Sequence, residues 1–437
     1  MSETYITETV HGETVKDGSI QARLNKETTT IDMSRLRQAI PKHCFEPSIA
    51  RSMSYVALDT FAYFALLTIA IWLHGKVGSW ASFTIRYLIY PALAGLPLTG
   101  LWINGHECGH GAFSKSKTVN NIVGMILHSA LLAPYYAWRS SHGRHHQYAN
   151  NMSTDLNYVP FTLSEYELSL AQRLTADHMG EDSPIVVSCR ILVQQVFGWP
   201  WYLLTHITAG RESSPRRSRG WWDNTHFLPS SSLFRKSEYW DIVISDVGIL
   251  SMIGCLYVLG NRFGSETMLW AYVLPWAWVN HWIVMITYLH HTSPSLPKFT
   301  DKSWTYLRGA LATVDRDPGV VLRYMFHHII DLHVIHHLFP RIPHYYAREA
   351  TDAIIPLLGD CYYVDQRPYW LALWEVFTQC QWVEPDLART KATNLGSVIS
   401  STVNYDDAEG VLWYRAGLMP AVVTTMRRSD SKDQHDE

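Results

Sequence analysis

The chain has 437 residues, enough on length alone for two soluble domains. Hydrophobic residues make up 47% and charged residues only 17%, against about 25% charged residues in a typical soluble domain. The formal net charge of -3 excludes a generally basic protein that binds nucleic acid. Six scattered cysteines without a CxxC pair exclude a disulfide scaffold. The composition therefore favours a membrane protein.

Residues 1–50 are polar, so we expect a cytosolic N-terminal segment, partly disordered, and not a signal peptide. Four later runs of about 20 residues are long and apolar enough to cross a hydrocarbon core of ~30 Å. They form two pairs with short connections, which predicts two helical hairpins whose ends return to one face of the membrane. The predicted spans are Ser54–His74, Thr84–Asn104, Tyr239–Gly260 and Met268–Tyr288.

Lysine and arginine accumulate on the cytoplasmic side of membrane proteins. Only Lys76, Arg86 and Arg262 lie in or beside the two short connections, so both termini and the polar middle are expected in the cytosol. A fifth apolar run, Val119–Trp138, carries several polar residues and is expected to be buried or interfacial. The predicted fold is an all-α integral membrane protein with a cytosolic helical cap. Its main domain covers residues 51–386, and a polar tail, expected to be disordered, covers residues 387–437.

Eight of the 22 histidines gather in three clusters beside the ends of the predicted spans. In the first cluster, HECGH, the two histidines stand four residues apart and share one helix face. The other two clusters have the pattern HxxHH. There we expect the first and fourth residues to share a face, with the fifth rotated by about 100°, so that one array serves two metal ions. The eight imidazoles are His106, His110, His142, His145, His146, His333, His336 and His337.

Eight imidazoles exceed the roughly four ligands that one zinc ion takes, so the clusters predict two metal ions. Imidazole suits Zn, Cu, Fe and Ni, and ligand type alone does not choose among them. The first cluster also matches HExxH, the helix signature of zinc metalloproteases with Glu107 as general base. A membrane zinc protease is therefore a remote alternative, which leaves both HxxHH clusters without a role.

Taken together, the clusters resemble the histidine boxes of membrane-bound fatty acyl desaturases, specifically the fungal oleate Δ12 desaturases. HECGH with the following AFS, then HGRHH, then HVIHH stand in the order of that family. The similarity extends to NNIVGMILHSALLAPYYAW between the first two boxes, to ITYLHHT after the last predicted span, and to IPHYYAREA after the third box. It covers roughly residues 45 to 415.

The resemblance implies a di-iron centre with O2 as co-substrate, held by the eight box histidines and by His291 as a ninth ligand. Glu107, Asp155 and Asp331 are expected to orient imidazoles as carboxylate partners. The roles of His290, His327 and His328 stay open. The acyl chain is expected in an apolar tunnel, for which the sequence offers Trp102, Tyr135, Trp138 and Trp282 as lining residues.

The resemblance further implies desaturation of a long fatty acyl chain at a mid-chain position, converting oleoyl to linoleoyl on a lipid or acyl-CoA carrier. Electrons would come from a separate cytochrome b5 and its NADH reductase, in the endoplasmic reticulum membrane. One departure is Gly111, where plant relatives carry histidine and many fungal ones glutamine. We expect this glycine to open space beside the metal. The alternative is therefore a diverted enzyme, an acetylenase, conjugase or hydroxylase acting on an unsaturated acyl or secondary-metabolite chain.

Overall fold

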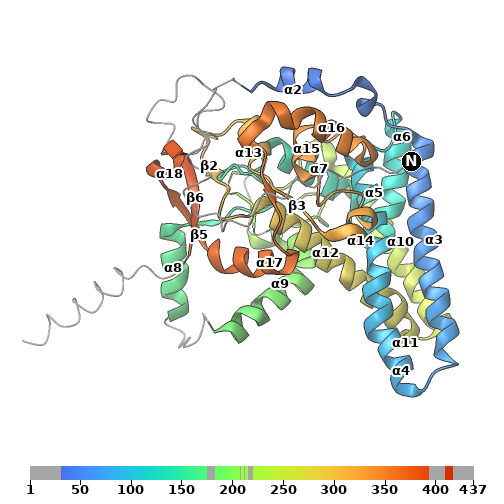
Figure 1. Cartoon of the computed structure of the whole chain (residues 1–437). Coiled ribbons are helices and arrows are strands. Elements are labelled where there is room, and N and C mark those ends of the chain that lie inside the picture. The colour runs from blue at the N-terminus through green and yellow to red at the C-terminus, as the bar shows by residue number, and fades with distance from the viewer. Residues whose placement is uncertain are drawn as a thin grey trace, which may run out of the picture.

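The computed structural model describes residues 31–174, 183–206, 208–210, 212–214, 220–392 and 409–416 (Figure 1). Most of the two expected polar segments, residues 1–30, 393–408 and 417–437, lies outside this described part. Over the described residues the chain is mostly helical, as its sequence predicts. Long helices extend to the lower right of Figure 1, away from a cap that the remaining elements build.

Both predicted hairpins coincide with pairs of long helical stretches. The first hairpin comprises α3 (Ile49–His74), α4 (Ser79–Thr84), the π-helical turn η2 (Ile85–Ile89) and α5 (Tyr90–His110). The second comprises α10 (Tyr239–Phe263), α11 (Ser265–Met268), the π-helical turn η5 (Leu269–Val273) and α12 (Leu274–His291). Both hairpins direct their second helix into the cap.

The outer and inner helices of these hairpins differ in character. Among the described residues, only Ile49–His74 and Lys236–Phe263 form helices that are long and apolar enough to cross a membrane by themselves. The inner helices α5 and α12 pack against each other and bury polar residues such as Asn104 and Asn280. A helix that faces protein on most sides needs no continuous apolar surface. The two inner spans therefore stay predictions.

The two π turns join the hairpins at the end far from the cap. The hydroxyls of Tyr63 and Tyr90 both donate to the carbonyl oxygen of Ala271 in η5, at 3.0 and 3.1 Å. A π turn disturbs the regular i to i-4 ladder, so its carbonyls need such partners. Arg86 in η2 forms an ion pair with Glu266 in α11, 3.0 Å between Nη1 and Oε1.

The cap contains the other helices, most of which lie to the left of the hairpins in Figure 1. They are α2 (Met33–Ala39), η1 (Lys42–Phe45), α6 (Lys117–Ala130), α7 (Tyr135–Tyr148), α8 (Leu163–Leu174), α9 (Pro184–Thr205), η3 (Trp221–Asp223), η4 (Lys236–Glu238), α13 (Tyr306–Leu311), α14 (Gly319–Met325), α15 (His333–Leu338), α16 (His344–Leu358), η6 (Gly359–Cys361), α17 (Tyr369–Gln379) and α18 (Leu387–Ala392).

Two small sheets correct the all-α expectation. Strands β1 (Phe161–Thr162), β5 (Trp382–Pro385), β6 (Val411–Arg415) and β2 (Lys298–Phe299) form one sheet in the order β1-β5-β6-β2. Strands β3 (Asp315–Arg316) and β4 (Val364–Asp365) pair in parallel. These strands have two to five residues, too few for an alternating pattern to reveal them in the sequence.

The expectation of a disordered tail is also wrong for the described residues after 386. Strand β6 lies between β5 and β2, antiparallel to both. Its Trp413 is fully buried, and the indole donates a hydrogen bond to the hydroxyl of Thr390 in α18. Residues 387–392 and 409–416 therefore belong to the folded cap. The sequence does not reveal this strand, because its partners come from distant parts of the chain.

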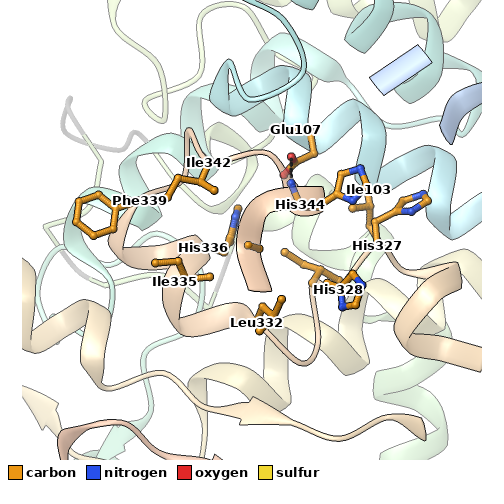
Figure 2. Close-up of a pocket in the computed structure, with 12 residues that line it drawn as sticks. Ile103, Glu107, His327, His328, Leu332, Ile335, His336, Phe339, Ile342 and His344 are labelled. Carbon is orange, nitrogen blue, oxygen red and sulfur yellow. Dashed lines mark hydrogen bonds between the residues drawn. The ribbon is translucent and has the colours of Figure 1, made fainter. Parts of the chain in front are cut away.

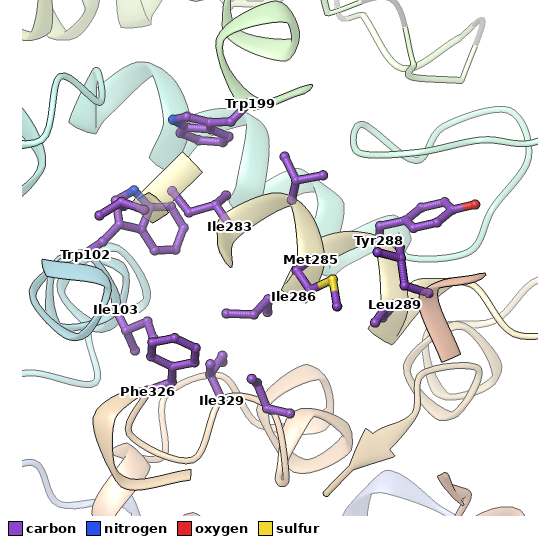
Figure 3. Close-up of a cluster of buried hydrophobic side chains, with 14 of the residues drawn as sticks. Trp102, Ile103, Trp199, Ile283, Met285, Ile286, Tyr288, Leu289, Phe326 and Ile329 are labelled. Carbon is purple, nitrogen blue, oxygen red and sulfur yellow. The ribbon is translucent and has the colours of Figure 1, made fainter. Parts of the chain in front are cut away.

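The fifth apolar run does not form one helix. A turn at residues 131–134 separates α6 from α7, and α6 has one exposed apolar side with Ile122 and Ile126. The largest core cluster surrounds α12 (Figure 3). There Ile283 and Ile286 lie between Trp102 of α5, Trp199 of α9 and Phe326 after α14. This core fixes the end of α12, where the histidines converge.

Candidate metal centre

Four helices carry the clustered histidines into one buried volume. The first cluster forms the last turns of α5, the second lies in α7, and the third forms the short helix α15. His291 is the last residue of α12. Helix α5 ends because Gly111 adopts a left-handed conformation with φ 73°, a common helix C-terminus. The site is therefore assembled from helix ends of both hairpins and the cap.

Five of these imidazoles form a first group, whose ligand atoms all lie within 4.8 Å of one another. The Nε2 atoms of His106 and His142 are 3.0 Å apart, and those of His142 and His146 are 3.1 Å apart. Nε2 of His110 lies 3.2 Å from that of His106. The first group consists of His106, His110, His142, His146 and His336.

The second group lies directly beside the first. It consists of His145, His291 and His337. Nε2 of His291 is 3.3 Å from Nε2 of His145 and 3.1 Å from Nε2 of His333, which adds the ninth imidazole to this side. The rings of His146 and His337 stack at 4.0 Å and so join the two groups.

The spacing of the nitrogens fits metal coordination. Ligands held ~2.1 Å from one ion are about 3.0–3.4 Å apart, the range observed among the Nε2 atoms. Several buried ring nitrogens in both groups have no hydrogen-bond partner, which is costly unless they bind something else. They include Nε2 of His336 and both ring nitrogens of His337. The residues present therefore fit two adjoining metal ions.

Burial favours the neutral form of most of these rings. Desolvation lowers the pKa of His110 to about 3, and it lowers the pKa of His106 and His142 well below the usual value. Neighbouring imidazoles lower these pKa values further, because two imidazolium charges would repel each other. Neutral imidazole is the form that binds a metal, so the site is ready for ions at neutral pH.

The residues of each HxxHH cluster are divided between the two groups differently from our expectation. His142 shares the first group with His146, the fifth residue of its cluster, whereas His145, the fourth, belongs to the second group. On an α-helix, residues i and i+4 differ by about 40° and residues i and i+3 by about 60°. The first and fifth residues are thus the better pair, and the conclusion that one array serves two ions still follows.

Asp155 contacts one of the clustered imidazoles directly. Its Oδ1 lies 2.6 Å from Nδ1 of His145, and both side chains are buried. Asp155 also accepts hydrogen bonds from the backbone N–H groups of Asn150 and Asn157. The carboxylate is therefore held in place by the backbone and in turn orients the ring of His145.

Glu107 is buried but faces away from its neighbouring imidazole. Its Oε2 accepts a hydrogen bond from the backbone N–H of His344 at 3.0 Å, and Oε1 is 3.9 Å from Nδ1 of His106. Burial raises the pKa of Glu107 to about 8, against the lowering effect of the bond from His344. Glu107 therefore links α5 to α16 and is beyond hydrogen-bond distance of His106.

The structure does not place Asp331 against a clustered imidazole. Its Oδ2 lies 3.0 Å from Nδ1 of His328 and 3.0 Å from Nη2 of Arg348, and Arg323 is also near. The expectation that Asp331 orients a metal ligand is therefore replaced by a role in an ion-pair network at the end of α14. Its position only two residues before His333 was the misleading signal.

The three histidines left open by the sequence lie outside both groups. The ring nitrogens of His290 face the carbonyl oxygens of Ile286 and Ile330, at 2.7 and 2.9 Å. Nε2 of His327 lies 2.7 Å from Oδ2 of Asp59 in α3. His328 binds Asp331. His290 thus connects α12, and His327 connects α3, to the turn between α14 and α15, and we assign no metal to any of the three.

Sequence reasoning missed two residues that hold the ligands. Nζ of Lys298 is buried and donates hydrogen bonds to the carbonyl oxygen of His291 at 2.9 Å and to Oδ1 of Asn150 at 2.6 Å. Burial lowers the pKa of Lys298 to about 8. Oδ1 of Asp315 accepts the backbone N–H of Val334 at 2.8 Å and so positions the start of α15. No motif marks either residue.

Two cavities border the site. One of about 10 Å³, room for about one water molecule, is lined by Glu107, His327, His328, His336 and His344 together with apolar side chains (Figure 2). The other, of about 120 Å³, lies between α9 and α12. It is mostly apolar, and its wall includes Trp199, Tyr202, Thr287 and Tyr288. Tyr288 is three residues before His291, so this cavity ends within one helical turn of the second group.

The four aromatic residues expected to line a tunnel have different places. Trp102 stacks on His106 and Trp138 stacks on His142, at 5.9 and 4.4 Å between ring centroids. Tyr135 is buried and donates to the carbonyl oxygen of Asn120. Trp282 packs edge-on against Phe326. None of the four is in the wall of the 120 Å³ cavity.

Comparison with known proteins identifies the family. The sequence profile described as "Fatty acid desaturase" matches residues 82–370. The chain is 38% identical over 371 residues to the Delta(12) fatty acid desaturase of Mortierella isabellina, covering 82% of this chain and 90% of the relative. It is 36% identical over 404 residues to the Delta(12)-oleate desaturase of Trichosanthes kirilowii, covering 91% and 99%. The oleate hydroxylase of Claviceps purpurea is 40% identical over 371 residues, covering 80% and 76%. The profile match, these identities and the buried imidazole groups lead to one conclusion: the chain belongs to the fatty acid desaturase family.

Proposed function

We propose that the protein introduces a second double bond into an oleoyl chain at the Δ12 position, using O2 at a di-iron centre. The single observation that carries this proposal is the convergence of nine imidazoles from four helices into two adjoining buried groups. The relatives named Delta(12) desaturases support the position of the new double bond.

The proposed ligands are His106, His110, His142, His146 and His336 for one ion, and His145, His291, His333 and His337 for the other. Two bound irons would supply the oxidising power that removes hydrogen from an unactivated carbon chain with O2. The balance is one acyl chain, one O2, two electrons and two protons giving one alkene and two waters. Acid–base chemistry by side chains alone cannot break such C–H bonds.

The chain's own residues position and shield this chemistry. Asp155 holds the ring of His145, while Lys298 and Asp315 hold the backbone of α12 and α15. Trp102 and Trp138 cover the ligands with apolar surface. The acyl chain is proposed to occupy the 120 Å³ cavity between α9 and α12, whose apolar wall suits a hydrocarbon.

The proposed setting is the endoplasmic reticulum membrane, with four spans and both termini in the cytosol. The two helices that can cross a membrane alone belong to different hairpins, and each hairpin brings its second helix back to the cap. The proposed partners are a fatty acyl lipid or acyl-CoA as substrate and a separate cytochrome b5 with its NADH reductase as electron source.

The test is expression of the full chain in yeast that lacks Δ12 activity, followed by fatty acid analysis. The expected product from oleate is an 18-carbon diene, and its absence from a well-expressed chain would contradict the proposal. A His142→Ala variant should make none, because it removes an imidazole from the centre of the first group. A His43→Ala variant, on the exposed surface, is the matched control and should keep the product.

Hydroxylation is the second candidate, since the oleate hydroxylase of Claviceps purpurea falls in the same range of identity. The same yeast experiment separates the two, because a hydroxylase would accumulate a hydroxy acid. A zinc protease is not favoured. His106 and His110 belong to a group of five imidazoles, and Oε2 of Glu107 accepts a hydrogen bond from the backbone N–H of His344.

A further inference from the structure

Helix α9 exposes an apolar side in addition to the side that it buries. Its inner side, with Val187, Gln195, Trp199 and Leu203, is buried. The opposite side exposes large apolar residues, and the polar Gln195 is only 4% exposed. A helix on a water-facing surface would carry polar residues on its exposed side, whereas a side that faces lipid is apolar. The outward residues include Ile185, Leu192, Phe197 and Trp201, which are 76%, 63%, 60% and 56% exposed.

Helices α14 and α17 repeat this feature. Val320, Val321 and Tyr324 of α14 are 67%, 64% and 62% exposed. Trp370 and Leu371 of α17 are 63% and 60% exposed, while Leu373 and Val376 of the same helix are buried. Several large apolar side chains exposed on one helix are uncommon on soluble monomers and indicate an interaction site.

The three helices pack against the inner helices of the hairpins: α9 and α17 contact α12, and α14 contacts α5. Trp199 of α9 and Leu373 of α17 belong to the largest core cluster, and Leu322 of α14 packs against it. In Figure 1, α9 and α17 lie along the lower edge of the cap, the side from which the long hairpin helices extend. We call the outward residues of the three helices the collar: Ile185, Leu192, Phe197, Trp201, Val320, Val321, Tyr324, Trp370 and Leu371.

We propose that the collar rests in the membrane, with α9, α14 and α17 lying in the interface of the leaflet next to the cap. The proposal depends on the proposed insertion of the hairpins but not on the reaction. Lipid is the occupant because α9 and α17 are on the side where the hairpins extend and α14 contacts the inner hairpin helix α5. Helices α3 and α10 already require lipid for Phe61 and Tyr257, each 71% exposed. Tryptophan and tyrosine in the collar are also typical of membrane interfaces.

This position has a consequence for the cavity between α9 and α12. Gly198 of α9 lies against Val284 of α12, and Trp199 and Tyr202 line the cavity from the α9 side. With α9 at the depth of the upper acyl chains, this helix lies between its side of the cavity wall and the lipid. The collar thus places the cavity at the level of the hydrocarbon, a few residues from His291.

The native Cys189 allows a direct test, because it is exposed on α9, and the other exposed cysteine in the described residues is Cys255. The full-length Cys255→Ser protein is labelled with a nitroxide at Cys189 and reconstituted in phosphatidylcholine bilayers. Collision rates with O2, which concentrates in lipid, and with a water-soluble nickel chelate are then compared. Val321→Cys and Leu371→Cys, in a Cys189→Ser and Cys255→Ser background, report on α14 and α17.

The expected result is a several-fold preference for O2 at Cys189 of α9, Val321 of α14 and Leu371 of α17. Asp352→Cys on α16 is exposed elsewhere on the cap and is the control, with the opposite preference expected. Collar labels as open to nickel as the control would overturn the proposal. Dipolar broadening that grows with the protein-to-lipid ratio would also overturn it, in favour of a second copy. The collision rates can be measured without enzymatic activity. A protein that shows the expected collision rates but makes no product would therefore contradict only the proposed function.

Discussion

Oδ1 of Asp155 lies 2.6 Å from Nδ1 of His145, and both side chains are almost fully buried. Oδ2 of the same carboxylate accepts the backbone N–H of Asn150 at 2.7 Å. The ring must therefore donate from Nδ1 and present the lone pair of Nε2 to the second group, where Nε2 of His291 is 3.3 Å away. One carboxylate thus fixes both the tautomer and the direction of a proposed ligand.

Asp155→Asn should lower metal affinity by about 10- to 100-fold. The amide can accept at only one oxygen, so its NH2 group would face either His145 or the N–H of Asn150, and one bond is lost. The measurement is iron per protein after dialysis against a graded chelator, with desaturation measured in parallel. Asp317→Asn on the exposed start of α14 is the matched control. Equal iron retention in the two variants would show that Asp155 does not support metal binding.

The neighbours His290 and His291 should respond in opposite ways to the same change. His291→Asn removes an imidazole from the second group, so bound iron and activity should both be lost. His290→Asn removes a ring whose nitrogens face two carbonyl oxygens. The variant protein should therefore be less stable, while its iron content should stay near that of the wild type. Metal analysis of the two purified variants decides, and iron loss from the His290 variant alone would reverse the assignment.

The metal-free protein should lose stability as the pH falls below about 6.5. Burial lowers the folded-state pKa of His110 and of His226 to about 3, whereas an unfolded histidine titrates near 6.5. Between these values the unfolded state binds more protons, so each such histidine removes about 1.4 kcal/mol of stability per pH unit. Above pH 6.5 both states are neutral and the effect is absent.

The check is the unfolding midpoint of chelator-treated protein from pH 8 to 5.5. His226→Asn should reduce the number of protons taken up on unfolding by about one, and the decline should be correspondingly less steep. His226 is suited to this test because it lies outside both imidazole groups. A midpoint that is constant or higher at pH 5.5 would contradict the linkage.

Lys298→Met should destabilise the protein by about 3 kcal/mol, because the carbonyl of His291 and Oδ1 of Asn150 would be left buried without a donor. The exposed Lys302→Met is the matched control and should change stability by less than about 0.5 kcal/mol. Thermal unfolding of both variants with and without iron measures the difference. Equal midpoints would show that Lys298 has no supporting role.

Gly111→Gln should keep the diene product and lower stability by about 1–2 kcal/mol. The reason is the backbone, since φ is 73° and an added Cβ would meet only Nδ2 of Asn120, at 3.8 Å. Gly143→Gln, inside α7 with open space around it, is the control and should not lower stability. Fatty acid profiles of oleate-fed cells and unfolding midpoints test both effects. A wild type that makes mainly hydroxy or acetylenic acids, with the diene restored by Gly111→Gln, would show a diverted enzyme.

The family and the eight box histidines could be predicted from the sequence, because helix geometry alone makes residues four apart neighbours and because the boxes occur together. Comparison confirms the family. The mostly helical fold was predictable as well, since runs of about 20 apolar residues need no knowledge of their partners. The small sheets were not, because β6 is recognisable as a strand only beside β5 and β2.

Within the site, sequence spacing determined which residues gather but not how they divide. His145 and His291 are 146 positions apart and meet only because α7 and α12 end at the same place. Asp155, near the second box, faces an imidazole, whereas Asp331, nearer to the third box, faces Arg348 and His328. Lys298 and Asp315 support the ligands through backbone atoms, which no side-chain motif records. A local pattern fixes the neighbours along one helix, while the contacts between helices depend on the packing of the whole core around α12, and only the tertiary structure decides them.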